Sequence, residues 1–507
     1  MKAACGTQAR SSGGERASAG SENAGRPLHT LSFFGFSAIT ASMVMTVYEY
    51  PTFASSGMNL VFFLVVGGVL WFLPVAMCAA EMATVDGWQS GGIYAWVGNT
   101  FGRRWGFAAL FYQWFQITVG FVTMSFFVLA ALSYVVGWSA LYDNPLVMFV
   151  GVAVIVWLLT LTQLGGTKLT ARISKIGFVG GIVVPVLMLM GGLVAYFATG
   201  GVSALAFDPS KIVPDFSNVD TLVIFASFVL AYMGVEASAS HVNELRNPKR
   251  DYPLAMIVLC AMAILFDAIG GMAVATALPA STLDGRQHEL RRYRGVSRHL
   301  RDALRHGLAR VRGGGSSGAR RSAEISAWIV GPSRALLETA REGIIPASFA
   351  RTNKHGVSVK TVVIQAAIVT FWDAVLCGSM ALSGGSSSSV AYLTAIGFTV
   401  VIYLVGYVLF FLGYLDLAFT KRDLARSFQI PGGVPVKAVM ALVGLFVTAA
   451  TLVISFFPSS ELSAEGNVVY EITLAASFAV SVAIPLVIYA LRRRGDKASS
   501  PTQEADK

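Results

Sequence analysis

Two acidic residues interrupt apolar segments of the sequence, and each lies close to a residue that breaks helices. Glu49 is two residues before Pro51, and Glu236 is two residues after Gly234. Because a carboxylate at the centre of a bilayer costs about 3 kcal/mol or more, such a residue usually faces a cavity. Proline removes a backbone donor and glycine weakens a helix, so both segments are expected to be discontinuous. The pattern predicts two polar breaks at membrane depth.

A break of this kind can bind the charged ends of an amino acid. Amide groups exposed at one half-helix end attract a carboxylate, and free carbonyl groups at the other end accept from an ammonium group. Paired breaks in two halves of a chain typically mark a transporter's substrate site. Glu49, Gly234 and Glu236 are therefore candidate substrate-binding residues. Two alternatives remain open, because Glu49 could extend to a membrane face and Glu236 could be a paired residue at a simple kink.

Two further pairs of residues are separated by four positions, which places both members on one helix face. Glu324 and Trp328 combine a carboxylate with an aromatic ring, an arrangement suited to contact with a cation or to a lid over a substrate. Tyr403 and Tyr407 supply two hydroxyl groups. An interfacial tryptophan beside an acid and ordinary buried tyrosines are the structural alternatives for these pairs.

The sequence offers little for catalysis or for a metal. It contains no Walker loop, zinc-spaced His/Cys set or nucleophile elbow, so an enzyme is not expected. Its four cysteines are scattered and indicate neither a disulfide framework nor a metal site. We therefore expect no catalytic residues, no metal and no cofactor.

The composition is that of an integral membrane protein. Of 507 residues, 55% are hydrophobic and 13% are charged, and the mean hydropathy of +0.63 is too high for a soluble globular protein. Apolar runs long enough to cross a bilayer recur along the chain. We predict transmembrane helices at about 31–56, 58–83, 105–136, 146–163, 173–199, 219–240, 253–278, 357–377, 390–417, 434–457 and 468–491, with a twelfth around 300–340.

The charges between these helices predict the orientation in the membrane. The connections on one side contain Lys211 as their only lysine or arginine, and they comprise residues 137–145, 200–218, 378–389 and 458–467. Positive charge favours the cytoplasmic side, so both termini are expected in the cytoplasm. Residues 1–28 lack the apolar core of a signal peptide and predict a disordered cytoplasmic tail. Residues 29–494 then form a polytopic transporter domain, and residues 495–507 form a short cytoplasmic tail.

Residues 280–322 do not fit this pattern. Within them, residues 285–321 contain eleven arginines against two acidic residues, although the twelfth helix is expected here. They account for most of the net charge of +10, so this charge does not indicate a nucleic-acid partner. Three explanations remain open: a basic extracellular loop, an amphipathic helix that binds anionic lipid, and a local reading-frame error in the gene. A shift of one nucleotide in the degenerate codons of residues 316–322 permits the apolar string LLALGVL, which would continue into Ala323.

Several long strings carry a family resemblance. They are AITASMVMTVYEYPTFASSG, LWFLPVAMCAAEMATVDGW, LTQLGGTKLTARISK, YMGVEASASHVNELRNPKRDYPLAM, AEISAWIVGPSR and FQIPGG. On these strings the chain resembles the bacterial glutamate/GABA antiporters of the amino acid–polyamine–organocation (APC) permease superfamily. The resemblance covers residues 30–491 with the exception of 280–322.

The resemblance implies an all-α integral membrane fold of about 12 transmembrane helices, with five-plus-five inverted repeats, discontinuous helices 1 and 6, and two extra helices. It implies a multi-pass protein of the bacterial inner membrane that exchanges external glutamate for internal γ-aminobutyrate. The small-molecule partners are then amino acids, alongside membrane lipid. A glutamate decarboxylase would be the functional partner, and the coupled reactions would remove cytosolic protons and support acid resistance.

Carried over by position, the resemblance implies a substrate site on four helices. Its residues are Tyr48 and Glu49 at the first break, Tyr232, Gly234 and Glu236 at the second, Glu324 and Trp328 on the eighth helix, and Tyr403 and Tyr407 on the tenth. Some family members close the cytoplasmic vestibule at neutral pH with a long C-terminal tail that contains histidine. Here thirteen residues follow Arg494, and no histidine follows His355. Activity is therefore expected to persist at higher pH.

Other functions remain open at this point. The same scaffold could exchange glutamine or another amino acid. A non-transporting membrane sensor fits less well, because such sensors usually carry a sizeable soluble domain and the tails here are short. The chain could also be the inactive product of a damaged reading frame.

Overall fold

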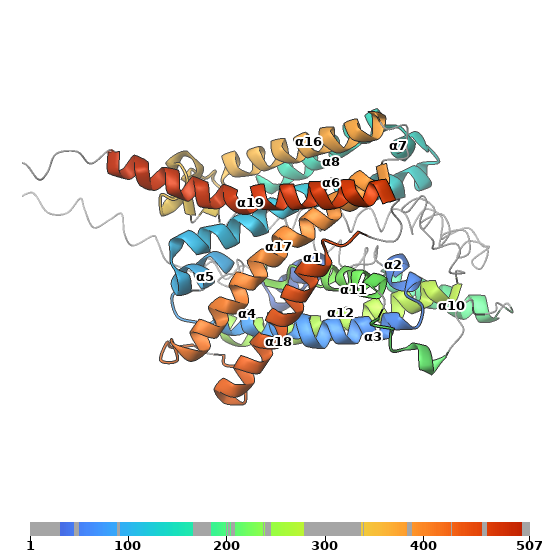
Figure 1. Cartoon of the computed structure of the whole chain (residues 1–507), viewed down its shortest axis with the longest axis horizontal. Helices are drawn as coiled ribbons and strands as arrows, with labels where there is room; N and C mark the ends of the chain where they lie inside the picture. The colour runs from blue at the N-terminus through green and yellow to red at the C-terminus, as the bar shows by residue number, and fades with distance from the viewer. Residues whose placement is uncertain are drawn as a thin grey trace, which may run out of the picture.

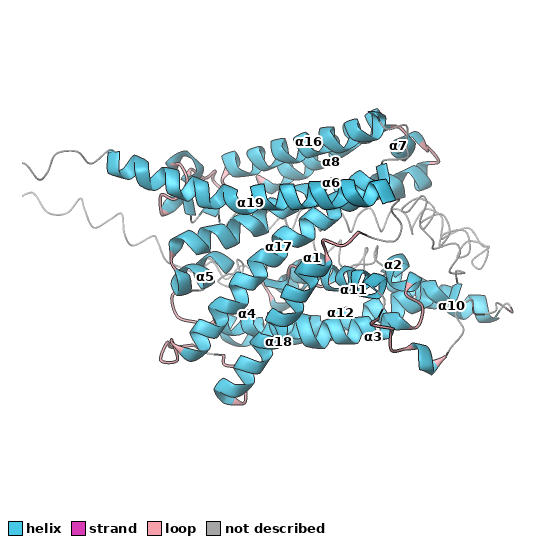
Figure 2. Cartoon of the chain, in the orientation of Figure 1, coloured by secondary structure: helices cyan, strands magenta, loops and turns pink. Residues whose placement is uncertain are grey.

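The computed structural model is built from helices (Figures 1 and 2). It describes residues 31–44, 50–88, 92–165, 184–198, 200, 203, 208–217, 219–236, 238, 245–277, 336–337, 339–382, 388–426, 428–458 and 464–498. Within these residues the extended contacts are two isolated bridges, Leu31 with Leu245 and Val85 with Arg426. The predicted all-α fold class is confirmed.

The helices follow the predicted spans closely. In chain order they are α1 (Phe33–Val44), α2 (Tyr50–Ser55), α3 (Asn59–Gly67), η2 (Gly68–Phe72), α4 (Leu73–Ala83), α5 (Ile93–Phe101), α6 (Arg103–Val136), α7 (Ala140–Asp143), α8 (Pro145–Gln163), α10 (Val184–Ala198), α11 (Val219–Ala231), α12 (Pro248–Ala277), α16 (Val359–Leu382), α17 (Ser388–Phe419), α18 (Gly433–Ile454) and α19 (Ala464–Ala498). Short 3₁₀ turns lie at Pro209–Lys211 and Ala347–Ala350. Among the described residues, 8 helical segments are long and apolar enough to cross a membrane, and each coincides with a predicted span.

The remaining predicted spans are described in part. The helix predicted at 173–199 is described from Val184, where α10 begins. The helix predicted at 219–240 ends earlier, at Ala231. The twelfth helix, predicted around 300–340, lies for the most part outside the described residues. The short helix α5 was not predicted from the sequence.

Two groups of helices are joined by α17 (Figure 1). In one group α6, α8 and α16 pack against one another, and in the other α12 packs against α3 and α4. Helix α17 contacts α6 on one side and α18 and α4 on the other, and it also packs against α19. The residues of α17 are therefore placed where the two groups meet.

Helix α8 shows how the outer helices meet the membrane. One face of it is buried in the protein and consists of Met148, Val152, Val156, Thr160 and Gln163. The opposite face is exposed although it is apolar, and it consists of Leu146, Val150, Val154, Leu158 and Leu161. In water the exposed face of a helix is normally polar, so this apolar stripe fits contact with lipid.

The second predicted helix break is present in the structure. Helix α11 ends at Ala231, and Tyr232, Met233 and Gly234 form a turn. Gly234 has a φ of 110°, which side chains with a Cβ rarely adopt. The first predicted break falls on residues 45–49, between α1 and α2, which lie outside the described residues.

A π-helical turn, η2, interrupts the second predicted span, residues 58–83. The backbone N–H of Leu73 donates to the carbonyl of Gly68, five residues earlier. The wider turn packs closely on its surroundings, since a Cβ on Gly68 would come within 2.5 Å of Ile264. Phe72, at the end of the turn, packs on the ring of Tyr232 with ring centroids 5.4 Å apart. The distortion in this span therefore lies beside the break that follows α11.

Candidate functional site

The carboxylate of Glu236 is buried and is bound by side chains from two other helices. Its relative exposure is 1%. Gln113 of α6 donates from Nε2 to Glu236 Oε1 over 2.9 Å. The hydroxyl groups of Tyr403 and Tyr407 on α17 donate to Oε1 and Oε2 respectively. The predicted break and the predicted tyrosine pair therefore meet at one carboxylate.

Tyr407 also contacts the backbone of the break itself. The N–H of Gly234 donates to its hydroxyl oxygen over 2.9 Å. This amide belongs to the turn that ends α11, where backbone groups have no partner within a helix. One tyrosine thus fixes both the backbone and the acidic side chain of the break.

The donors to Glu236 are neutral, which leaves its charge available for a cation. Among the ion pairs of the described residues, none includes Glu236. A carboxylate can accept about four hydrogen bonds, so donors from Gln113, Tyr403 and Tyr407 do not exhaust it. In a medium of low dielectric constant, an ammonium group is the natural complement. The arrangement can hold the amino group of a substrate.

The other predicted site residues differ in how the structure describes them. Tyr232 is fully buried, and its hydroxyl donates to the carbonyl of Leu64 over 3.2 Å, so its polar group already contacts the second span. Tyr48, Glu49, Glu324 and Trp328 lie outside the described residues. Their roles in substrate binding remain predictions.

Gln113 was missed by the sequence analysis. It is a buried amide within the apolar span α6, with 4% exposure. An uncharged polar residue inside a predicted span indicates a polar site, as an intramembrane acid does, because burial of an unpaired amide is also costly. The indication is weaker because the cost is smaller. A search for buried amides would have found it together with Gln116, which is 2% exposed.

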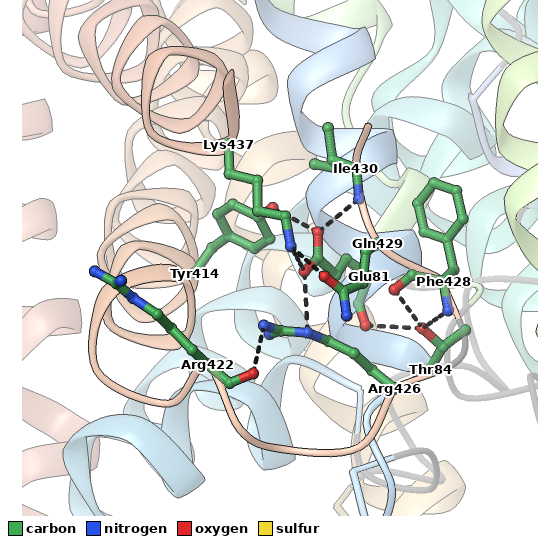
Figure 3. Close-up of polar contacts among 9 residues, drawn as sticks. All are labelled: Glu81, Thr84, Tyr414, Arg422, Arg426, Phe428, Gln429, Ile430 and Lys437. Carbon is green, nitrogen blue, oxygen red and sulfur yellow. Dashed lines mark hydrogen bonds and ion pairs between the residues drawn. The ribbon is translucent and has the colours of Figure 1, made fainter. Parts of the chain in front are cut away.

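A second buried carboxylate, Glu81, lies near the end of α4 (Figure 3). Its Oε1 is 2.7 Å from Lys437 Nζ and 3.3 Å from Arg426 Nε. Its Oε2 accepts from the hydroxyl of Tyr414 over 2.8 Å and from the backbone N–H of Ile430 over 3.0 Å. The side chains of Glu81, Arg426 and Lys437 are 0%, 3% and 4% exposed. Its carboxylate therefore binds groups from other elements rather than the end of its own helix.

This cluster fixes α17 relative to α4 and α18. Tyr414 comes from α17, Lys437 from the start of α18, and Ile430 from the connection between them. Lys437 also donates to the side-chain oxygen of Gln429 in that connection over 3.0 Å. Because α17 carries Tyr403 and Tyr407 as well, the cluster at one end of the helix supports the site nearer its middle.

The described residues contain no group of three or more His, Cys, Asp or Glu side chains that could hold a metal ion. Three described cysteines, Cys78, Cys260 and Cys377, are free and buried.

A family model described as "Amino acid permease" matches residues 31–310 and 313–478. The chain belongs to the amino acid permease family. The match covers nearly all of the described helices, including α11, α17 and the turn that holds Glu236. It confirms the predicted superfamily, which is consistent with a fold of about 12 transmembrane helices, and it identifies a transporter rather than an enzyme.

Curated relatives of this permease match at least nine-tenths of its length. A glutamate/gamma-aminobutyrate antiporter of Lactococcus lactis subsp. lactis (strain IL1403) is 49% identical, across 92% of this chain and 91% of that protein. A protein of the same name from Lactococcus lactis subsp. cremoris (strain MG1363) is also 49% identical, across 93% of each chain. An uncharacterised transporter of Legionella pneumophila is 30% identical, across 90% of this chain and 95% of that protein. The chain is thus a multi-pass membrane protein of a family of amino acid permeases, and two of its relatives are named as antiporters.

Proposed function

We propose that this permease exchanges external glutamate for internal γ-aminobutyrate across the bacterial inner membrane. The observation that carries the proposal is 49% identity with two glutamate/gamma-aminobutyrate antiporters over more than nine-tenths of each chain. Each substrate has an ammonium group that Glu236 would bind, and a carboxylate that backbone amides at a helix break would bind. The charge bias of the connections supports a cytoplasmic position for both termini.

The exchange would couple naturally to a cytosolic decarboxylation. Removing the α-carboxyl group of glutamate as CO₂ takes up one proton and leaves γ-aminobutyrate. A glutamate decarboxylase would therefore convert the imported substrate into the exported one, and each cycle would remove a proton from the cytosol. The expected consequence for the cell is acid resistance.

The proposed site extends beyond the described residues. Tyr48 and Glu49 would complete it from the first break, and Glu324 and Trp328 would complete it from the eighth helix. Glutamate has two carboxylates, whereas γ-aminobutyrate has one, so the protonation of Glu49 and Glu324 would select substrates by their negative charge. Glutamine and other neutral amino acids are the alternative cargo.

A counterflow experiment tests the substrate pair. Purified protein is placed in liposomes loaded with γ-aminobutyrate, glutamine, arginine or no amino acid, and uptake of labelled glutamate is followed. We expect uptake with γ-aminobutyrate inside to exceed uptake into empty vesicles by about tenfold or more, and arginine to give no stimulation. If glutamine inside the vesicles stimulated glutamate uptake and γ-aminobutyrate did not, the proposed substrate pair would be wrong. A folded protein whose glutamate uptake is not stimulated by any internal amino acid would contradict a transport function.

We further propose that the arginine-rich segment 285–321 results from a shifted reading frame. The family model matches residues 31–310 and 313–478, so the proposal rests on the eleven arginines that stand where a membrane span is expected. We expect resequencing of the DNA that encodes residues 280–323 to give an apolar segment with few arginines. An unchanged sequence would leave a genuine basic segment and contradict the shifted frame. The transport experiments use the protein encoded by the resequenced gene.

A further inference from the structure

The indole of Trp71 is held rigidly inside the π-helical turn η2. Trp71 is 0% exposed, and its Nε1–H donates to Oγ1 of Thr448 on α18 over 2.9 Å. The hydroxyl of Thr448 in turn donates to the carbonyl of Gly444 over 2.7 Å. With its proton used in this way, Thr448 presents a lone pair to the indole. The donor of Trp71 and the acceptor of Thr448 are thus matched, and both are buried.

The same indole contacts the tyrosine that binds Glu236. The ring centroids of Trp71 and Tyr407 are 4.9 Å apart, and the rings are inclined by 71°, an edge-to-face contact. Tyr407 has its hydroxyl on Glu236 and Gly234. A continuous chain of contacts therefore leads from α18, through Trp71 and Tyr407, to the helix break.

The residues around these contacts are packed so closely that Trp71 and Tyr407 have little room to move. A Cβ on Gly444 would lie 2.3 Å from the ring of Phe411, so α18 approaches α17 as closely as a glycine allows. A Cβ on Gly68, at the start of η2, would meet Ile264 at 2.5 Å. π-Helical turns shift the residues that follow them and are frequent at functional sites. Here the turn carries Trp71, whose indole makes the edge-to-face contact with Tyr407.

We propose that Trp71 is a positioning residue. Its ring holds Tyr407 so that the tyrosine hydroxyl contacts Glu236 and Gly234, and its own position is fixed by the hydrogen bond to Thr448. The inference rests on the proposed function, because its effect is measured as affinity for the amino acid substrate. Trp71 does not touch substrate in this account. Its loss should therefore weaken binding and leave the rate of the transport steps nearly unchanged.

Two substitutions separate the indole donor from the indole ring. Trp71→Phe keeps an aromatic ring beside Tyr407 but removes the N–H, and Thr448→Val removes the acceptor at similar volume while leaving Trp71 in place. We expect each to raise the KM for glutamate about tenfold, the scale of one lost hydrogen bond to a charged group, with the maximal exchange rate within about twofold. Thr448→Ser keeps the acceptor and should keep the wild-type KM.

A double-mutant cycle shows whether Trp71 acts through Tyr407. In a Tyr407→Phe background the hydroxyl is already absent, so adding Trp71→Phe should raise the KM no further. Trp96→Phe is the matched control: Trp96 is a fully buried tryptophan that contacts Phe410 on the same helix at 5.8 Å, and its substitution should leave the KM unchanged. An equal rise of the KM from Trp71→Phe in both backgrounds would overturn the proposal, and so would an unchanged KM in Trp71→Phe and Thr448→Val.

The wild-type protein distinguishes this inference from the proposed function. If it exchanges an amino acid other than glutamate, the substrate pair is wrong, and the same cycle is measured with the amino acid that it carries. Stabilisation of the detergent-solubilised protein by that amino acid, read as a shift of Tm, gives the affinity without any transport step. The dependence of the Trp71→Phe effect on Tyr407 supports or overturns the positioning role with either substrate.

Discussion

Glu236→Gln is expected to raise the KM for both glutamate and γ-aminobutyrate by about 100-fold or more. The substitution keeps the shape of the side chain but removes the negative charge that we propose binds the substrate ammonium group. It also places an NH₂ group among donors, because Gln113, Tyr403 and Tyr407 all donate to the native carboxylate. Hydrogen bonds to charged groups contribute about 1.5–3 kcal/mol each, and the loss of about 3 kcal/mol corresponds to the stated factor. The measurement is initial exchange rate against substrate concentration in proteoliposomes.

Asp373→Asn provides the matched control for this result. Asp373 is also a fully buried acid within a span, on α16, and its Oδ1 accepts from the thiol of Cys377 over 3.4 Å. It has no described contact with Glu236, so its substitution should leave both KM values within about twofold of the wild type. If the two substitutions had equal effects, the loss in Glu236→Gln would reflect a general cost of altering buried acids.

Glu81→Gln is expected to lower the free energy of unfolding by about 3–5 kcal/mol, the cost of leaving buried charges without their counter-ion. Lys437 and Arg426 are both nearly buried and share the one carboxylate of Glu81. Nη1 of Arg426 has no partner in the described structure, so this guanidinium depends strongly on Glu81. The measurement is unfolding of the detergent-solubilised protein, by heat and by denaturant, with substrate absent.

Two further variants make the result specific. Asp416→Asn breaks an ion pair of 2.9 Å with Lys421 whose side chains are 24% and 28% exposed, and it should cost less than about 1 kcal/mol because water solvates the separated charges. Replacing Glu81, Arg426 and Lys437 together by apolar residues should restore much of the stability, since no charge is then left buried. Wild-type stability in Glu81→Gln would show that the cluster does not hold α4, α17 and α18 together.

The spans were predictable because the bilayer imposes a length and a composition on each helix. The eight apolar segments found in the described residues coincide with predicted ones, and the break after α11 lies at the predicted Gly234 and Glu236. The four-residue spacing of Tyr403 and Tyr407 also predicted a common helix face, and both hydroxyls contact Glu236. Local spacing therefore predicted the helices and some of the residues that lie around Glu236.

The contacts between distant segments were not predictable in the same way. Glu81 and Lys437 are 356 positions apart, and Gln113 and Glu236 are 123 positions apart. Such pairs depend on how helices pack, which the apolar periodicity of each helix does not determine. The π-helical turn at Gly68–Phe72 leaves no compositional mark either, because it changes the backbone hydrogen-bond register by one residue within an apolar run.

Exchange by wild type and Glu236→Gln, compared at equal amounts of folded protein, tests most directly whether the site at Glu236 carries glutamate/γ-aminobutyrate exchange. Vesicles are loaded with γ-aminobutyrate, and labelled glutamate is supplied outside at a low concentration. We predict that wild-type vesicles accumulate glutamate above the external concentration and that Glu236→Gln vesicles do not. Equal accumulation by the two proteins would contradict a substrate site at Glu236, and no accumulation by the folded wild type would contradict exchange of this pair.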